Sequence, residues 1–292
     1  MMPSELDISA VKDFGDSVDF GKTASDYSTH RAGFPDAFFD FLAAQGYIKK
    51  GLNALDLGTG TGTVARGLAL CGLHVTGIDP AATLLAEAAK LDRQAGVRIQ
   101  YCQGRAENLE VADQSLDIVT AGQCWHWFER AKTASGVFRL LKPGGRLIIA
   151  HFDWLPLAGN VVEATEKLIL KYNPAWALSG GAGIYPDWLA DMAQAGFAKL
   201  QTHSFDIAQP YSPDGWCGRI RASAGIKASL NTNEIAAFDA ELRILLKTDF
   251  PQDPLLIPHR VWLATGLRPN RQAPIPVAFS SVKRPRSSDG NR

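Results

Sequence analysis

The sequence has no excess of charge of either sign, because its 292 residues include 30 Lys and Arg and 30 Asp and Glu. This balance argues against a nucleic-acid partner, since binding to phosphates draws on an excess of basic residues. The four cysteines are scattered and form no Cys-x-x-Cys pair. They therefore suggest neither a zinc site nor a disulfide framework, and we expect no metal ion.

Long apolar runs are missing as well, and no stretch is apolar over the length that a helix needs to cross a bilayer. The first residues lack the basic segment and apolar run of a signal peptide, and the sequence contains no internal repeat. We therefore expect a cytoplasmic protein without membrane contact. Its length is enough to bury a substantial core in one large domain, or in a domain with a cap.

The most informative stretch that is present runs from Asn53 to Gly62, where an apolar strand breaks into a glycine-rich turn before helix-compatible sequence. Glycine lets a backbone turn sharply and approach a ligand without a Cβ in the way. A dinucleotide site has the spacing Gly-x-Gly-x-x-Gly. Here the third glycine comes one place early, and Thr63 stands where that site has its last glycine. The spacing therefore disfavours an NAD(P)-dependent oxidoreductase.

Asp56 stands two places before the first glycine, so the loop reads Asp-x-Gly-x-Gly-x-Gly over Asp56, Gly58, Gly60 and Gly62. This form resembles the nucleoside-binding loop of class I S-adenosylmethionine-dependent methyltransferases. The resemblance implies that the glycines pass close to the methionine and ribose parts of S-adenosyl-L-methionine. A tight strand–helix turn without a ligand is the packing alternative.

Four further segments follow in the order of that family. The strand His74–Asp79 ends in an acid, which in Rossmann-like sites binds both ribose hydroxyls. The others are the loop Gly104–Glu107 after a strand at Val97–Cys102, a strand at Ser115–Thr120, and the turn Pro143-Gly144-Gly145 into a fifth strand. The resemblance implies an α/β fold: a Rossmann-like, doubly wound seven-stranded sheet with the last strand antiparallel, and a helical lid.

We expect residues 1–50 to form an N-terminal helical arm and residues 51–268 to form the methyltransferase domain. Lid insertions at about 152–196 and 209–258 would cover the carboxyl ends of the strands, where open α/β sheets bind ligands. Residues 269–292 are rich in Pro, Ser and Arg, which predicts a disordered tail. Strands six and seven are expected at Ala198–Ala208 and Arg260–Gly266.

The resemblance implies cofactor contacts by twelve residues: Tyr27, Arg31, Asp56, Gly58, Thr59, Gly60, Gly62, Asp79, Pro80, Ala106, Glu107 and Gln123. Asp79 also fits as the N-cap of a helix that starts at Pro80. Asp56 either contacts the methionine ammonium or accepts hydrogen bonds from its own loop. Ala106 is expected to offer its N–H to adenine, whereas Arg105 replaces an Asp that many members carry.

Tyr27 and Arg31 form a Tyr-x-x-x-Arg segment like that of the trans-aconitate methyltransferase-like group, which belongs to the type 11 methyltransferases. The resemblance implies that Arg31 pairs with the methionine carboxylate, a task that suits a bidentate guanidinium. On a helix the two positions also form an ordinary surface pair. Both interpretations stay open at the level of the sequence.

The chemistry is expected just after the fourth strand, at Gln123–Phe128. This segment lacks the Asn/Asp-Pro-Pro-aromatic motif of enzymes that methylate nucleobase amino groups. Its Trp-His-Trp-Phe run instead resembles the His-Trp-Phe of the trans-aconitate-like group. Trp125 or Trp127 is a candidate to face the sulfonium or to line the acceptor pocket, since aromatic faces attract cations; in the alternative both are core aromatics. His126 is a candidate general base, or a pocket wall that donates a hydrogen bond.

The lid carries Arg219 and Arg221, which point apart on a helix, so at most one of them faces inward. An inward arginine, for which Arg219 is our candidate, suits an anionic acceptor; two solvated arginines are the alternative. We therefore expect an S-adenosylmethionine-dependent methyltransferase acting on a small organic molecule, with O-methylation of a carboxylate as one form. A non-catalytic cofactor-binding or scaffold protein is the rival from another class. The oligomeric state stays open.

Overall fold

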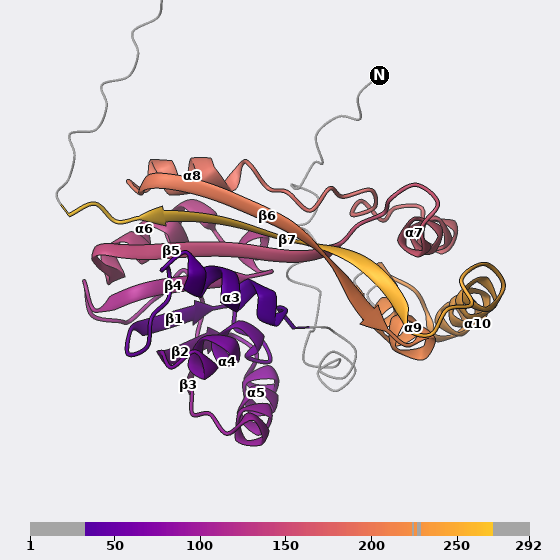
Figure 1. Ribbon diagram of the computed structural model, residues 1–292, viewed down its shortest axis with the longest axis horizontal. Coiled ribbons are helices and arrows are strands. Elements are labelled where there is room, and N and C mark those ends of the chain that lie inside the picture. Colours follow the sequence, from indigo (N-terminus) through magenta and orange to yellow (C-terminus); the bar gives the residue numbers. More distant parts are fainter. Residues whose placement is uncertain (1–32, 224, 227–228, 271–292) are drawn as a thin grey trace, which may run out of the picture.

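The computed structural model describes residues 33–223, 225–226 and 229–270. Its centre is a single sheet made of β1 Asn53–Leu57, β2 His74–Asp79, β3 Gln100–Gln103, β4 Leu116–Gly122, β5 Leu141–Trp154, β6 Ala198–Tyr211 and β7 Leu255–Leu267. The strand order is β3-β2-β1-β4-β5-β7-β6 (Figure 1). β1 to β5 pair in parallel, and β7 is antiparallel to both of its neighbours. The predicted seven-stranded sheet with an antiparallel last strand is confirmed.

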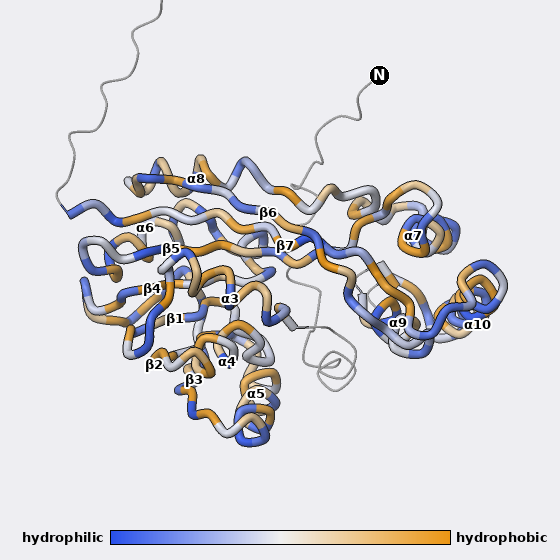
Figure 2. The backbone as a smooth tube through the Cα atoms, viewed as in Figure 1, coloured by the Kyte–Doolittle hydropathy of each residue, from blue (hydrophilic) through white to orange (hydrophobic). Residues whose placement is uncertain are grey.

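Helices cover both faces of this sheet. These are α3 Asp36–Ala44, α4 Thr63–Leu70, α5 Ala82–Ala95, α6 Arg130–Leu140 and α8 Trp188–Gln194. The other helices are α7 Val161–Tyr172, α9 Pro213–Arg221, α10 Thr232–Asp249 and the 3₁₀ helix η2 Trp125–Trp127. Because the connections between parallel strands run through helices, each face of the central strands is buried and the strands are apolar along their length. Figure 2 shows hydrophobic residues along much of the central strands and a mixture of hydrophilic and hydrophobic residues along the outer helices.

Successive side chains of β5 illustrate how the sheet separates two cores. Leu147 and Ile149 pack on one face with Trp188 of α8. Ile148 and Ala150 pack on the other face, in the same cluster as residues of α3 and α4. The alternation follows from the period of two along a strand. The two cores fix the orientation of β5, and with it the directions of the side chains at its carboxyl end.

β5, β6 and β7 extend beyond the parallel strands. Gly122, the last residue of β4, pairs with Ala150, whereas β5 continues to Trp154 along β7. Figure 1 shows β6 and β7 continuing as a twisted pair, with α9 and α10 at its far end and α7 nearby. We call α7, α9 and α10 the lid helices. They share a separate core with the ends of the two strands, which includes Trp216, Phe238 and Ile257.

Two expectations about the elements need correction. The Pro-Gly-Gly turn lies inside β5 as an irregularity, because Leu116 pairs with Leu141 while Ile118 pairs with Arg146. The helix α8 falls in the range expected for the first lid insertion, yet its Trp188 and Met192 pack on the sheet face beside α6. We therefore restrict the lid proposal to the three lid helices.

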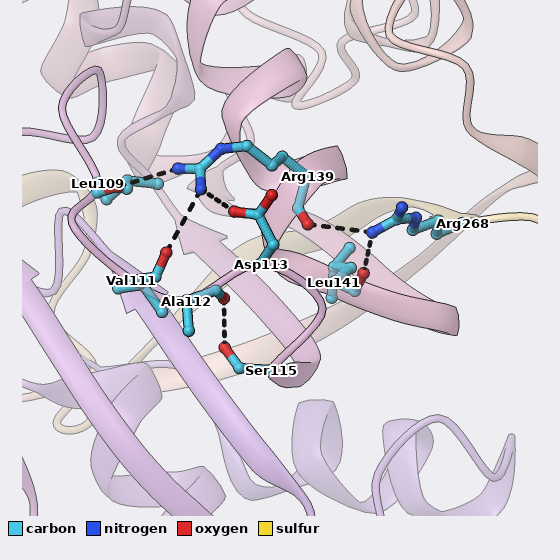
Figure 3. A network of polar contacts seen from close by, with 8 residues as sticks. All are labelled: Leu109, Val111, Ala112, Asp113, Ser115, Arg139, Leu141 and Arg268. Carbon is cyan, nitrogen blue, oxygen red and sulfur yellow. Dashed lines mark hydrogen bonds and ion pairs between the residues drawn. The ribbon is translucent and has the colours of Figure 1, made fainter.

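A polar network fastens the segment between β3 and β4 to α6 (Figure 3). The Arg139 guanidinium donates to the carbonyl oxygens of Leu109 at 3.0 Å and Val111 at 3.4 Å, and it pairs with Asp113. Arg268, just after β7, donates to the carbonyl oxygen of Arg139 at 3.0 Å. These arginines donate hydrogen bonds to carbonyl groups that the loop and the helix end would otherwise leave unpaired. The same bonds hold in place the loop that starts at Gly104.

Across the ranges that the structure describes, no helix combines the length and the apolar character needed for a membrane span.

Candidate functional site

Of the three glycines in the loop after β1, one has open space beside its backbone. Gly58, Gly60 and Gly62 all have positive φ, at 57°, 55° and 77°. A Cβ at Gly58 would lie 2.9 Å from Cys124 Cβ, and one at Gly62 would lie 2.3 Å from Tyr101 Oη. A Cβ at Gly60 would meet no heavy atom of the described residues within 4 Å. Gly60 is therefore the place where a ligand can lie against the loop.

Asp79 joins the end of β2 to this loop. One carboxylate oxygen accepts a hydrogen bond from Gly60 N at 2.9 Å, and the other accepts one from Ala81 N at 2.9 Å. Burial raises the pKa of the Asp79 carboxyl, although these two bonds oppose the shift. A carboxylate has about four lone-pair sites, so capacity for further donors remains. The N-cap-like contact with Ala81 and a contact with ligand hydroxyls are therefore compatible.

Asp56 lies beneath the loop and is 1 % exposed. It accepts hydrogen bonds from the hydroxyls of Thr59 and Thr120, both at 2.6 Å, and from the backbone of Ala65. Burial outweighs these bonds and raises the pKa of Asp56 to about 6. A carboxylate enclosed in this way offers no open side to a ligand ammonium. The geometry favours the alternative in which Asp56 braces the loop, and Thr59 belongs to that brace.

Hydrogen bonds connect the loops at the carboxyl ends of the four parallel strands β1 to β4. Gly104 N donates to the carbonyl oxygen of Asp79 at 3.2 Å, which joins the loop after β3 to the end of β2. Glu107 accepts from Glu129 N at 3.0 Å, so the same loop meets the start of α6. Cys124 Sγ donates to the carbonyl oxygen of Leu57 at 3.1 Å. The candidate cofactor residues from separate motifs thus converge on one edge of the sheet.

Other expected cofactor residues sit at this edge with different exposure. Ala106 is buried and Pro80 is exposed, while the Arg105 side chain is 69 % exposed and lies 3.8 Å from Glu107. The exposed Arg105 fits a solvated charge rather than a contact with adenine. Tyr27 and Arg31 lie outside the described residues, so their roles stay predictions.

Gln123 follows β4 with a backbone φ of 57°, in the left-handed region that residues other than glycine rarely adopt. Its backbone N–H donates to Ala150 at 2.8 Å, and its side-chain amide donates to the carbonyl oxygen of Phe152. Such strained residues cluster at ligand sites. Both contacts hold the segment after β4 against the carboxyl end of β5.

The structure separates the aromatic residues of η2. Trp125 is fully buried, and its indole N–H donates to Asp191 of α8 at 3.0 Å. These contacts fit the alternative in which Trp125 is a core aromatic, and they give no support to a contact between Trp125 and a substrate. His126 is only partly buried, and its ring lies 4.7 Å from the Trp127 ring and 5.4 Å from the His151 ring. Of the two predicted acceptor residues in η2, the geometry thus retains His126.

The sequence interpretation missed the neighbours of His126. His151 lies at the carboxyl end of β5, with its Nδ1 3.3 Å from Asp153 Oδ2. The Tyr185 hydroxyl donates to the same oxygen at 2.7 Å, and burial, together with the Asp153 charge, raises the pKa of Tyr185. The available signal was the pair of polar residues at alternate positions, His151 and Asp153, at the end of an apolar strand.

The two lid arginines point to different partners. The Arg219 guanidinium lies over the Trp154 ring, 4.7 Å from its centroid, whereas Arg221 pairs with Asp239 of α10. Burial, with a smaller contribution from the charge of Arg219, lowers the pKa of His259 on β7 to about 4. Arg219 therefore lies against the extended end of β5, Arg221 joins two lid helices, and the substrate-binding role of Arg219 stays a prediction.

Comparisons with known proteins agree with the fold. Residues 55–149 match the family model described as a methyltransferase domain. The chain is similar to an uncharacterized methyltransferase of Mycobacterium tuberculosis, with 34% identity over 152 residues. That alignment covers 50% of this chain and 59% of the relative, so the chain spans less than two thirds of the length of this curated relative.

Solved structures with low identity share the fold. The YcgJ protein from Bacillus subtilis superposes with a TM-score of 0.53 at 19% identity, over 80% of this chain and 99% of that one. Phosphoethanolamine N-methyltransferase 2 of Haemonchus contortus, in complex with S-adenosyl-L-methionine, also gives 0.53 at 19% identity, over 88% and 60%. From the matched motifs, the fold and the family model, the chain carries a methyltransferase domain of class I, the S-adenosylmethionine-dependent family.

Proposed function

We propose that the protein transfers a methyl group from S-adenosyl-L-methionine to a small organic acceptor. The observation that carries this proposal is the open face of Gly60 beside the Asp79 carboxylate. The two residues are joined by the hydrogen bond from Gly60 N to Asp79 Oδ2 at 2.9 Å. A ligand that combines hydroxyl donors with an extended chain along the glycine loop fits such a surface. S-adenosylmethionine, when bound, supplies the electrophilic methyl group.

The residues of the carboxyl edge would divide the binding task. Asp79 would accept hydrogen bonds from the ribose hydroxyls, since its oxygens retain lone pairs. The backbone of Gly60 would lie against the ligand, and Ala106 would offer its N–H to the adenine. Asp56 would act from below by fixing the loop. Positioning of the two reactants is the main contribution expected from such a site.

We further propose that the acceptor carries a carboxylate. Arg219 supports this, because its guanidinium is held over the ring of Trp154 at the end of β5, 4.7 Å from the centroid. The trans-aconitate-like resemblance implies that the carboxylate itself is methylated. Such an oxygen is already ionised at neutral pH, so it needs orientation and charge compensation rather than a base.

The proposal is tested by incubating the purified chain with methyl-labelled S-adenosylmethionine and pooled small metabolites. We expect label in a small molecule, and its release by mild alkali would identify an ester. Calorimetry should show S-adenosylhomocysteine binding more tightly than NAD. Tighter binding of NAD would overturn the cofactor assignment. Binding of S-adenosylhomocysteine without transfer to any pool would favour the non-catalytic rival.

The anchor is tested by Arg219→Met, which deletes the charge and keeps much of the apolar stem. We expect the Michaelis constant for an anionic acceptor to rise roughly ten- to 100-fold, as for loss of a hydrogen bond to a charged group. A neutral analogue of the same shape should be little affected. Arg221→Met is the matched control, because Arg221 pairs with Asp239. Equal losses for both acceptors would indicate that Arg219 only packs on Trp154.

A further inference from the structure

His151 and Asp153 form a buried polar pair that the proposed function has not used. His151 is 4 % exposed at the carboxyl end of β5, where strand alternation places both side chains on the α8 side of the sheet. Asp153 Oδ2 lies 3.3 Å from His151 Nδ1 and accepts the Tyr185 hydroxyl at 2.7 Å. A carboxylate can only accept at these distances, so the imidazole proton sits on Nδ1.

This tautomer leaves Nε2 of His151 with a lone pair that is available to a donor but buried from solvent. The atom is buried, and no residue that the structure describes gives it a hydrogen bond. A buried acceptor without a donor is unfavourable, so such atoms usually meet a donor in the working state of a protein. The lone pair of His151 Nε2 therefore points to a missing donor close to the carboxyl end of β5.

The surroundings of the ring limit which donor that is. Tyr185 and Trp188 lie 4.4 and 4.8 Å from the His151 ring, and they stack on each other at 4.3 Å. The Tyr185 hydroxyl is already committed to Asp153. The remaining polar rings are the Trp188 indole and the His126 imidazole, whose ring lies 5.4 Å away at 58°. Of these two, only His126 is part of the predicted acceptor site.

We propose that Tyr185, Asp153 and His151 form a relay that positions His126 by accepting one of its N–H groups at His151 Nε2. The negative end of the relay favours the protonated form of His126, which then carries a second N–H. That N–H suits an anionic oxygen of the acceptor. Only this last step rests on the proposed function, because Tyr185, Asp153 and His151 are already joined without cofactor or acceptor. His151 and Asp153 are thus positioning residues.

Charged groups of other elements also surround η2 and bear on the charge of His126. Arg130 at the start of α6 pairs with Asp191 of α8 at 3.5 Å, and Asp191 also accepts from Trp125. Glu107 is engaged by the backbone of Glu129. These charges are compensated or hydrogen-bonded by groups other than His126, whereas Asp153 lies 3.3 Å from His151, the proposed partner of His126.

The relay is tested by nuclear magnetic resonance titration of the histidine side chains in the ¹⁵N-labelled protein, with His126 assigned from its loss in His126→Gln. Asp153→Asn should lower the midpoint of His126 by roughly one pH unit, because the opposite charge is removed. Tyr185→Phe should raise the midpoint, because Asp153 loses a competing donor and accepts more strongly from His151. Opposite shifts from two neighbouring substitutions are not expected from a loss of packing.

His203→Asn is the matched control, since His203 lies on β6 and contacts Tyr47 at 3.0 Å; it should leave the His126 midpoint unchanged. Trp188→Phe removes the rival N–H and should also leave it unchanged. The relay is overturned if Asp153→Asn and Tyr185→Phe shift the His126 midpoint in the same direction, or if neither substitution shifts it. Because no cofactor or acceptor is added, this outcome is independent of whether methyl transfer is found.

Discussion

Asp79→Ala is expected to weaken the binding of S-adenosylhomocysteine roughly ten- to 150-fold, which corresponds to about 1.5–3 kcal/mol for hydrogen bonds to a charged group. The carboxylate that would receive the ribose hydroxyls is lost, and Gly60 N loses the acceptor that holds it at 2.9 Å. Isothermal titration calorimetry measures the change directly. A large effect is expected from this one carboxyl group, because it would bind the ligand and also holds the glycine loop.

The matched control for this experiment is Asp117→Ala. Asp117 on β4 accepts hydrogen bonds from Asn53 N at 2.9 Å and from Lys142 Nζ at 2.7 Å, near the amino ends of the parallel strands. Its replacement therefore removes a comparable set of bonds from the same sheet without touching the glycine loop. We expect it to lower stability and to leave cofactor affinity nearly unchanged. Equal losses of affinity in both variants would reduce Asp79 to a structural residue.

The parallel half of the fold was predictable because its signals are local. β1, β2 and β4 are short, largely apolar runs that end near a glycine or an acid, and the spacing of Gly58, Gly60 and Gly62 fixes the turn after β1. β3 was expected at Val97–Cys102 but lies at Gln100–Gln103. Its position follows from pairing with β2, from Thr76 opposite Gln100 to Asp79 opposite Gln103.

The length of β5 was not predictable in the same way. Its last residues are half-polar, and they are strand because they pair with β7, as in Asp153 opposite Arg260 and Trp154 opposite His259. Partners about a hundred positions away leave no local pattern. His151 and Asp153 were missed as site residues for this reason, since their place beside η2 depends on that extension.

The role of Trp125 was open for a related reason. A run of four aromatic or imidazole side chains does not reveal which of them turns inward. The tight turn of η2 buries Trp125 completely and leaves His126 partly exposed. The inward side chain is selected by Asp191, which lies on a helix from another part of the chain and accepts its N–H. Tertiary contacts thus decide between two roles that the sequence leaves equivalent.

Gly60→Ala is expected to produce the clearest separation between stability and binding. Its Cβ would meet nothing within 4 Å among the residues described, so the protein should fold with only the cost of a left-handed backbone, about 1–2 kcal/mol. The same methyl group would project into the space proposed for the ligand. Overfilling such a space costs about 1–3 kcal/mol, so we expect S-adenosylhomocysteine affinity to fall roughly five- to 150-fold by calorimetry.

Gly46→Ala supplies the control that isolates this effect. Gly46 has a φ of 68° after α3, and a Cβ there would also meet nothing within 4 Å in the described part of the chain. The two variants therefore carry the same kind of backbone penalty, and thermal unfolding should show similar losses. Only Gly60→Ala should lose affinity, because only Gly60 lies beside Asp79. If both variants bound the ligand as the unmodified protein does, the ligand would not lie against the glycine loop, and the proposed cofactor site would be wrong.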